Sequence, residues 1–243
     1  MEILQVNKEL VIGILGGMGP EATSDCFGKL IKNTRAGSDQ EHLEIVIVNN
    51  PKVPDRTSAI LGNGPSPVPV LLQGVDSLKS AGADFVIIPC VTVHYFLKEL
   101  LEQCDMEVLS ILDSVAEHIT RSYPKMKTVG LLATNGTARS QIFQKRLKEE
   151  GIDTLVCSDQ EQQKVMAAIT DIKNENSPRT RAEITGSLAD AAAHLVRRGA
   201  QSIIAGCTEI PLVLAQKDVA VPYFDSLLIL ARSAIRRAGR EPV

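Results

Sequence analysis

The stretch Asp84-Phe-Val-Ile-Ile-Pro-Cys90-Val-Thr-Val-His94 predicts a short buried strand that runs into a cysteine and then into a helix. A second stretch, Gln201-Ser-Ile-Ile-Ala-Gly-Cys207-Thr-Glu-Ile-Pro211, has the same layout. Their cysteines are 207 − 90 = 117 residues apart. The glycines at positions 13 and 130, in two apolar runs further upstream, are separated by the same interval, 130 − 13 = 117. Two landmarks with one offset indicate an internal duplication, which places one thiol at the same point of each half, facing one cleft.

Strands and helices are expected to alternate along the chain, which predicts parallel sheets joined by right-handed crossovers. The expected fold class is α/β: two pseudo-symmetric parallel-sheet αβα sandwich domains with the active site in the cleft between them. Residues 1–118 would form the first half and residues 119–243 the second. The C-terminal helix is a candidate to pack back on the first half.

The expected elements follow from apolar runs, from amphipathic periodicity and from the glycines that end helices. Strands are expected at residues 10–15, 44–48, 85–88, 108–112, 128–133, 154–157, 202–205 and 219–224. Helices are expected at residues 20–33, 70–81, 92–103, 114–122, 140–150, 159–173, 180–198 and 226–238. Residues 49–57 should form a rigid loop, residues 62–69 a flexible loop and residues 134–137 a turn.

The composition is that of an ordinary globular protein, and it excludes several classes of function. A chain of 243 residues suits one large domain or two domains of roughly 100–120 residues each. A net charge of −3 gives no electrostatic case for nucleic acid or for an anionic membrane as a partner. We find no apolar run of the roughly 18 residues that a membrane span needs, and no signal peptide. A cytoplasmic location is therefore expected.

The five cysteines predict neither a disulfide framework nor a metal site. Their number is odd, and the sequence has no Cys-x-x-Cys or His-x-x-x-His pair. The only near match is Cys90 with His94, and His94 is expected to be structural, at the start of a helix. The cysteines outside the two matching stretches are expected to be structural as well: Cys26, Cys104 and Cys157.

Two segments of the first half are candidates to bind an anion. The turn Gly16-Gly-Met-Gly19 offers backbone N–H groups at the start of a helix. It lacks the Gly-x-Gly-x-x-Gly spacing of a dinucleotide site, so a small carboxylate fits it better. Arg56 follows the second strand, at the edge of the sheet where open α/β folds bind ligands. Its guanidinium could grip a carboxylate with two hydrogen bonds, although a solvated surface arginine is the simpler reading.

Two thiols on opposite sides of a cleft suit the inversion of a stereocentre that carries an acidic hydrogen. One group takes a proton from one face, and the other group returns a proton to the opposite face. A thiol has a pKa near 8.5, and a helix N-terminus favours its thiolate. Cys90 and Cys207 both stand where a strand turns into a helix, so the sequence predicts that they act as the two bases.

Five motifs resemble the cofactor-independent aspartate/glutamate racemases, over nearly the whole chain, and the aspartate racemase branch most closely. The motifs are Gly13-Ile-Leu-Gly-Gly-Met-Gly-Pro-Glu-Ala-Thr23, Asn49-Asn-Pro-Lys-Val-Pro-Asp-Arg-Thr57, Ile88-Pro-Cys90, Gln163-Lys-Val-Met166 and Gly206-Cys-Thr-Glu-Ile-Pro-Leu212.

The resemblance implies an isomerase that racemises an acidic amino acid such as aspartate or glutamate without pyridoxal phosphate, metal or nucleotide. Cys90 and Cys207 would exchange the roles of acid and base with the direction of the reaction. Arg56 and Lys164 would hold the substrate carboxylates. A homodimer is the implied assembly. The remaining residues implied to line the cleft are Met18, Thr92, Thr134 and Thr208.

The chain departs from this family at Val91. Members of the family usually have Asn-Thr-Ala-His after the first cysteine, and here the run is Val-Thr-Val-His. Val91 replaces an amide that is expected to touch the substrate, so it either reshapes the pocket for another amino acid or leaves a protein that binds without turnover. Two alternatives therefore stay open: a silent binding protein for a small dicarboxylate, and a related carbanion chemistry such as decarboxylation or cis–trans isomerisation. The run Gly-Cys-Thr-Glu-Ile-Pro speaks against the second.

Overall fold

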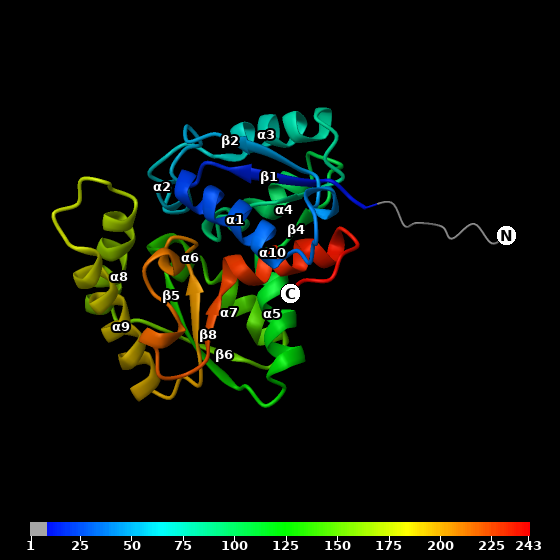
Figure 1. Cartoon of the computed structure of the whole chain (residues 1–243). Coiled ribbons are helices and arrows are strands. Elements are labelled where there is room, and N and C mark those ends of the chain that lie inside the picture. Colours follow the sequence, from blue (N-terminus) through cyan, green and yellow to red (C-terminus); the bar gives the residue numbers. More distant parts are fainter. Residues whose placement is uncertain (1–8) are drawn as a thin grey trace.

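The computed structural model describes residues 9–243 and contains two four-stranded sheets in which all neighbouring strands are parallel (Figure 1). The first sheet has the order β2 (Ile45–Asn49), β1 (Ile12–Gly16), β3 (Phe85–Ile87), β4 (Val108–Leu109). The second has the order β6 (Asp153–Val156), β5 (Thr128–Ala133), β7 (Ile203–Gly206), β8 (Tyr223–Asp225). The two orders are equivalent, which confirms the predicted α/β fold with two matching parallel sheets.

Each sheet is buried on both faces, which is why its central strands read as continuous apolar runs. Along β1, Ile12 and Ile14 belong to one core cluster and Leu15 belongs to another, because neighbouring side chains of a strand point to opposite faces. Along β5, Leu131 and Leu132 divide between two clusters in the same way. One cluster lies between the two sheets, and the other two lie on their outer faces.

Ten α-helices are assigned within residues 9–243. They are α1 (Pro20–Asn33), α2 (Arg56–Ile60), α3 (Val68–Ser80), α4 (Leu97–Leu101), α5 (Ile111–Ser122), α6 (Asn135–Ser140), α7 (Ile142–Glu149), α8 (Asp159–Ile172), α9 (Arg181–Arg197) and α10 (Ser226–Arg237). Short 3₁₀ helices are η1 (Asp39–Glu41), η2 (Thr92–Phe96), η3 (Ile210–Leu212) and η4 (Gln216–Asp218). No helix of these residues is long and apolar enough to cross a membrane.

Several predicted boundaries are wrong, and N-capping side chains explain three of them. Asp55 accepts from Ser58 N and starts α2 inside the predicted rigid loop. Ser110 accepts from Asp113 N and starts α5 where the strand at residues 108–112 was expected to continue. Thr134 accepts from Thr137 N and starts α6 where a turn was expected. The single helix expected at residues 92–103 is instead η2 followed by α4.

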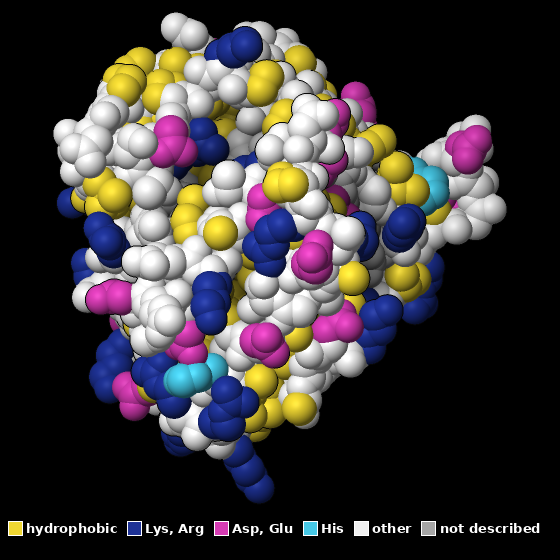
Figure 2. Space-filling model, turned by 90° about the vertical axis from the view of Figure 1, so that its left-hand side faces the viewer, with side chains coloured by type: hydrophobic (Ala, Val, Ile, Leu, Met, Phe, Trp, Pro, Cys, Tyr) yellow, Lys and Arg dark blue, Asp and Glu magenta, His cyan; other side chains and the backbone are white. Residues whose placement is uncertain are grey.

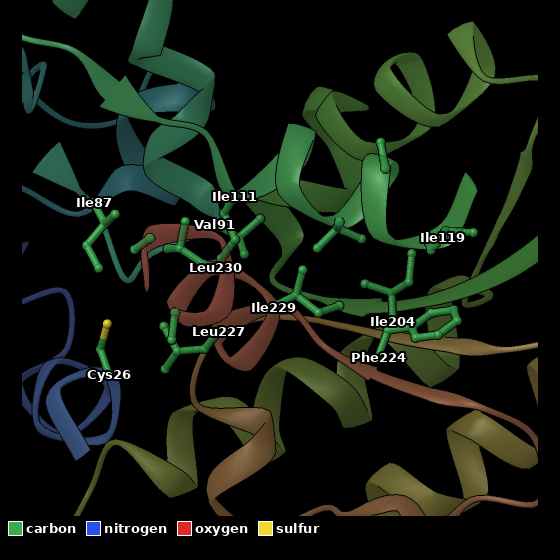
Figure 3. Packing of buried hydrophobic residues seen from close by; sticks show 14 of the residues in the cluster. Cys26, Ile87, Val91, Ile111, Ile119, Ile204, Phe224, Leu227, Ile229 and Leu230 are labelled. Carbon is green, nitrogen blue, oxygen red and sulfur yellow. The ribbon is translucent and has the colours of Figure 1, made fainter. Parts of the chain in front are cut away.

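The last helix of each half packs across the boundary between the halves (Figure 1). Helix α10, which follows β8, packs on α1, and helix α5, which follows β4, packs on α7. The two exchanged helices also pack on each other. Figure 3 shows the result: Ile87, Val91 and Ile111 lie in one cluster with Leu227 and Leu230 of α10. The central core is therefore shared by both halves.

Matching ion pairs connect the exchanged helices to their hosts. Lys29 of α1 lies 3.3 Å from Asp225, the N-cap of α10. Arg146 of α7 pairs with Asp113, in the first turn of α5. The two cations are 146 − 29 = 117 residues apart, which is the offset of the repeat.

The division expected between residues 118 and 119 stays a prediction. It falls inside α5, whereas residues 123–127 lie between α5 and β5.

Candidate active site

Both sheets point the carboxyl ends of their central strands at one small cavity of about 50 Å³ between the halves. Parallel sheets commonly bind ligands at this edge. The cavity is lined from the first half by Met18, Asp55, Arg56, Thr57, Cys90, Val91 and Thr92, and from the second half by Thr134, Met166, Ile169, Lys173, Cys207, Thr208 and Glu209.

The structure brings together all but one of the residues that the sequence suggested for the site. Cys90 and Cys207 line the same cavity from opposite halves, and each is about 5% exposed. Lys164 is the exception. It is exposed on α8 and is not among the lining residues, so the expectation that Lys164 holds a substrate carboxylate is not met. Lys173, at the C-terminal end of the same helix, reaches the cavity instead.

Cys207 is held in its thiol form. Its Sγ donates a hydrogen bond to Glu209 Oε2 over 2.9 Å. Burial raises the pKa of Cys207 well above its ordinary value, and the neighbouring charge of Glu209 raises it further, while Lys173 opposes the shift. Cys207 is therefore protonated at neutral pH.

Cys90 is positioned through its backbone by a buried histidine. Nδ1 of His94 lies 2.9 Å from the carbonyl oxygen of Cys90, and Nε2 accepts from Ile111 N over 3.1 Å. Since a backbone N–H can only donate, the proton of the neutral ring belongs on Nδ1. Burial lowers the pKa of His94 to about 4. His94 is not among the lining residues, so it is a neutral tie between the Cys90 segment and α5, as its structural interpretation predicted.

Glu209 is the polar centre of the site, and the sequence analysis did not single it out. It is only 2% exposed. Its Oε1 accepts from Gly19 N over 3.0 Å and lies 2.9 Å from Lys173 Nζ. Its Oε2 accepts from Cys207; Thr208 Oγ1 lies 3.3 Å from the same oxygen but points its one proton at the nearer carbonyl oxygen of Pro89. This carboxylate is therefore paired with a cation, a backbone amide and a thiol, which makes its burial tolerable.

Arg56 has donors that its own neighbours do not use. Its Nη1 donates to the carbonyl oxygens of Val53, over 3.1 Å, and of Pro54, over 2.9 Å. Its Nε is buried and has no hydrogen-bond partner within residues 9–243. A buried, unpaired donor of a guanidinium is costly. Arg56 also lines the cavity, where its positive charge suits a carboxylate.

Threonine hydroxyls join the two halves beside the cysteines. Thr92 Oγ1 lies 2.9 Å from Thr134 Oγ1 and 3.0 Å from Thr137 Oγ1. On the other side, Thr208 Oγ1 donates to the carbonyl oxygen of Pro89 over 3.0 Å. These bonds fix the separation of the two halves at the level of the thiols.

Gly136 of α6 allows this close approach. A Cβ atom on Gly136 would lie 2.8 Å from Thr57 Oγ1 and 2.9 Å from Thr92 Cγ2, both in the opposite half. We expect Gly136→Ala to push the halves apart, to lower the free energy of unfolding by about 1–3 kcal/mol and to reduce kcat/KM. Urea denaturation and steady-state kinetics measure the two effects.

Gly186 of α9 provides the matched control, because a Cβ atom there meets nothing within 4 Å. Gly186→Ala should leave activity unchanged and leave stability equal or higher by up to about 1 kcal/mol. If Gly136→Ala behaved like this control, the close approach at α6 would not matter.

Within residues 9–243, no group of three or more His, Cys, Asp and Glu side chains is placed to hold a metal ion, and all five cysteines are free. The face that carries α8 and α9 shows Lys and Arg interspersed with Asp and Glu rather than a patch of one sign (Figure 2).

Comparisons with known proteins agree over nearly the whole chain. The profile of the family described as Asp/Glu/hydantoin racemase matches residues 15–234. The broad specificity amino-acid racemase RacX of Bacillus subtilis (strain 168) is 30% identical over 231 residues, which cover 93% of this chain and 96% of RacX. The Picrophilus torridus aspartate racemase superposes with a TM-score of 0.85 at 31% identity, over 96% of each chain. An aspartate racemase homologue from Pyrococcus horikoshii OT3 gives a TM-score of 0.74 at 26% identity, over 96% of this chain and 100% of that one.

Proposed function

Because the chain belongs to the Asp/Glu/hydantoin racemase family, we propose that it racemises an amino acid with Cys90 and Cys207 as its two bases and without a cofactor. The observation that carries the proposal is the placement of the two thiols in one cavity, one from each half. The reaction is an isomerisation, so the cavity needs an acid and a base but no oxidant or second substrate.

In one direction of the proposed reaction, Cys90 is the base and Cys207 is the acid. Cys90, as thiolate, removes the α-proton; the C–H bond breaks and its electron pair stays on the substrate, spread into the carboxylate. Cys207, held as a thiol by Glu209, gives its proton to the opposite face of the α-carbon. The product leaves with inverted configuration, and the reverse reaction starts from the other pair of protonation states.

Arg56 supplies the fixed positive charge that this chemistry requires. Negative charge grows on the substrate carboxylate as the α-proton leaves, and a preorganised donor in a water-poor site stabilises it most effectively. Arg56 lines the cavity, and its buried Nε has no hydrogen-bond partner within residues 9–243. We therefore assign the α-carboxylate to Arg56.

The proposed function is tested by proton exchange in D2O. Each enantiomer of a panel of amino acids is incubated with the protein, and loss of the α-proton signal is followed by NMR. Aspartate and glutamate, which the resemblance implies, belong in the panel. Exchange with inversion supports the proposal. If no amino acid in the panel exchanges, the protein is not a racemase, and a silent binding protein becomes the better account.

We extend the proposal to the assembly and location that the resemblance implies, a homodimer in the cytoplasm. Light scattering coupled to size-exclusion chromatography measures the assembly directly. A mass of one chain, 26.2 kDa, across micromolar concentrations would contradict the dimer.

Replacing Arg56 with glutamine should raise KM by about 10- to 100-fold, because charge-assisted hydrogen bonds to a carboxylate contribute roughly 1.5–3 kcal/mol. Steady-state kinetics with the best substrate measure the change. Lys164→Gln is the matched control: this exposed lysine lies outside the cavity, so its replacement should leave KM and kcat as they are. A larger effect of Lys164→Gln than of Arg56→Gln would reverse the assignment.

A further inference from the structure

The charges that line the cavity balance without a substrate. They are two anions, Asp55 and Glu209, and two cations, Arg56 and Lys173. Lys173 and Glu209 form an ion pair of 2.9 Å in which the Glu209 side chain is only 3% exposed. One cation and one anion are therefore already committed to each other.

The remaining two charges suit the backbone of an amino acid. The positive charge of Arg56, which lines the cavity, is available to the α-carboxylate. Asp55 is adjacent in sequence, and its bonds to Ser58 N and Ser58 Oγ, at 2.7 and 2.8 Å, both use Oδ1. Although burial alone would raise the pKa of Asp55, the hydrogen bonds from Ser58 lower it overall, so this carboxylate is ionised at neutral pH. It complements the substrate ammonium group.

A second carboxylate on the substrate would lack a partner unless Lys173 left Glu209. Glu209 would then be left next to Cys207 with only a backbone amide and a thiol as donors. The Lys173 side chain is 36% exposed, but the Glu209 carboxylate is buried, so moving the cation away would leave a buried charge without its partner, and the pair opposes this exchange.

Part of the remaining wall is apolar and carries Met18, Val91, Met166 and Ile169. The other uncharged lining residues are the two cysteines and four threonines, Thr57, Thr92, Thr134 and Thr208. Val91 is 1% exposed, and it packs in the central core near Ile111 and Leu230 of the exchanged helix (Figure 3). The apolar part, backed by a close-packed core, offers no hydrogen bond to a charged side chain, and the threonine hydroxyls supply no charge that would balance a second carboxylate.

We propose that the substrate is an amino acid with a small or medium-sized uncharged side chain, such as alanine, methionine or leucine, rather than a dicarboxylate. This inference rests on the proposed racemase function and names its substrate class. The Lys173–Glu209 pair excludes the second carboxylate by keeping the only other cation of the cavity neutralised, and Val91 supplies an apolar contact for the side chain.

The panel of α-proton exchange rates tests the inference directly. Alanine, methionine and leucine are compared with aspartate and glutamate at equal concentration and pH. The best uncharged amino acid should have a kcat/KM at least 10-fold above that of either dicarboxylate. Exchange of aspartate or glutamate at an equal or higher rate overturns the inference and leaves the proposed function standing. The absence of any exchange overturns the function itself.

Two variants test the cause of the preference. Glu209→Gln frees the charge of Lys173, and Val91→Asn places an amide on the apolar wall. Each should shift the ratio of aspartate exchange to methionine exchange upward by about 10-fold, even where absolute rates fall because Glu209 also contacts Cys207. Val91→Ala, which changes volume without adding a polar group, is the control and should not raise the ratio. Circular dichroism confirms folding, and a ratio that stays constant in both test variants contradicts the assignment.

Discussion

Serine in place of Cys90, or in place of Cys207, should slow racemisation by about 10²- to 10⁴-fold, the range that a positioned acid or base contributes. A serine hydroxyl keeps nearly the size of the thiol, but it gives up its proton far less readily at neutral pH. Circular dichroism of an α-amino acid follows the loss of optical activity, and the deuterium exchange described above follows each proton transfer separately.

The two variants should differ from each other in which enantiomer they still exchange. In each variant the remaining cysteine faces one side of the α-carbon only, so the two patterns should be complementary. Cys104→Ser is the control, because Cys104 is not among the cavity-lining residues and its replacement should leave both rates intact. Equal and unimpaired exchange of both enantiomers in both active-site variants would remove the two-base mechanism.

The second large effect is a loss of stability in mild acid that depends on His94. Its pKa is lowered from the ordinary 6.5 to about 4 by burial, so between these values the unfolded chain binds more protons than the folded one. The contribution of His94 is therefore fully present above pH 6.5 and is lost as the pH falls towards 4. The difference of 6.5 − 4 = 2.5 units corresponds to roughly 3 kcal/mol.

Urea denaturation of the wild type and of His94→Gln from pH 7.5 to pH 4.5 measures this contribution. Other titrating groups act in both proteins, so the difference between the two stability profiles isolates the histidine. The difference should shrink by a large part of that 3 kcal/mol as the pH is lowered. Parallel profiles would show that the buried ring does not titrate in this way.

Much of the fold could be predicted because residue types and their spacing indicate both the duplication and the buried strands. The apolar runs around Gly13 and Phe85 are continuous since both faces of the sheet are covered, and they led to the correct strands. The starts of α2, α5 and α6 were missed because each depends on one short side chain, Asp55, Ser110 or Thr134, bonding to an amide three residues later. Such caps are common in loops too, so they are weak signals in a sequence.

The cations of the site illustrate what spacing can and cannot supply. Lys164 was chosen through a motif, yet it points to solvent, whereas Lys173 lines the cavity from the end of the same helix. The interval 173 − 56 = 117 between Arg56 and Lys173 equals the offset of the repeat. The strands β2 and β6, which precede the two cations, are offset by only 153 − 45 = 108 residues. The repeat is therefore not in step between these strands and the cations, and the sequence alone could not pair Arg56 with Lys173.

Glu209 was missed for a different reason. Its position is Thr92 in the other half, 209 − 92 = 117 residues earlier, so the repeat itself gives no sign of a carboxylate there. Only the folded chain shows that one buried group accepts from Gly19, Lys173 and Cys207 together. The asymmetry has a chemical meaning: the two thiols are related by the repeat, but one alone has an acidic neighbour.

The crossing of α5 and α10 bears on the origin of the chain. A single half on its own would end in a helix whose apolar side does not pack on that half. Such a half would be expected to form a twofold dimer in which the two copies exchange their last helices. In the present chain, residues 123–127 join the two halves covalently, so the exchanged helices stay in place at any protein concentration. Within one chain the two halves can also differ in sequence, and here Glu209 lies beside Cys207 whereas Thr92 occupies the equivalent position beside Cys90.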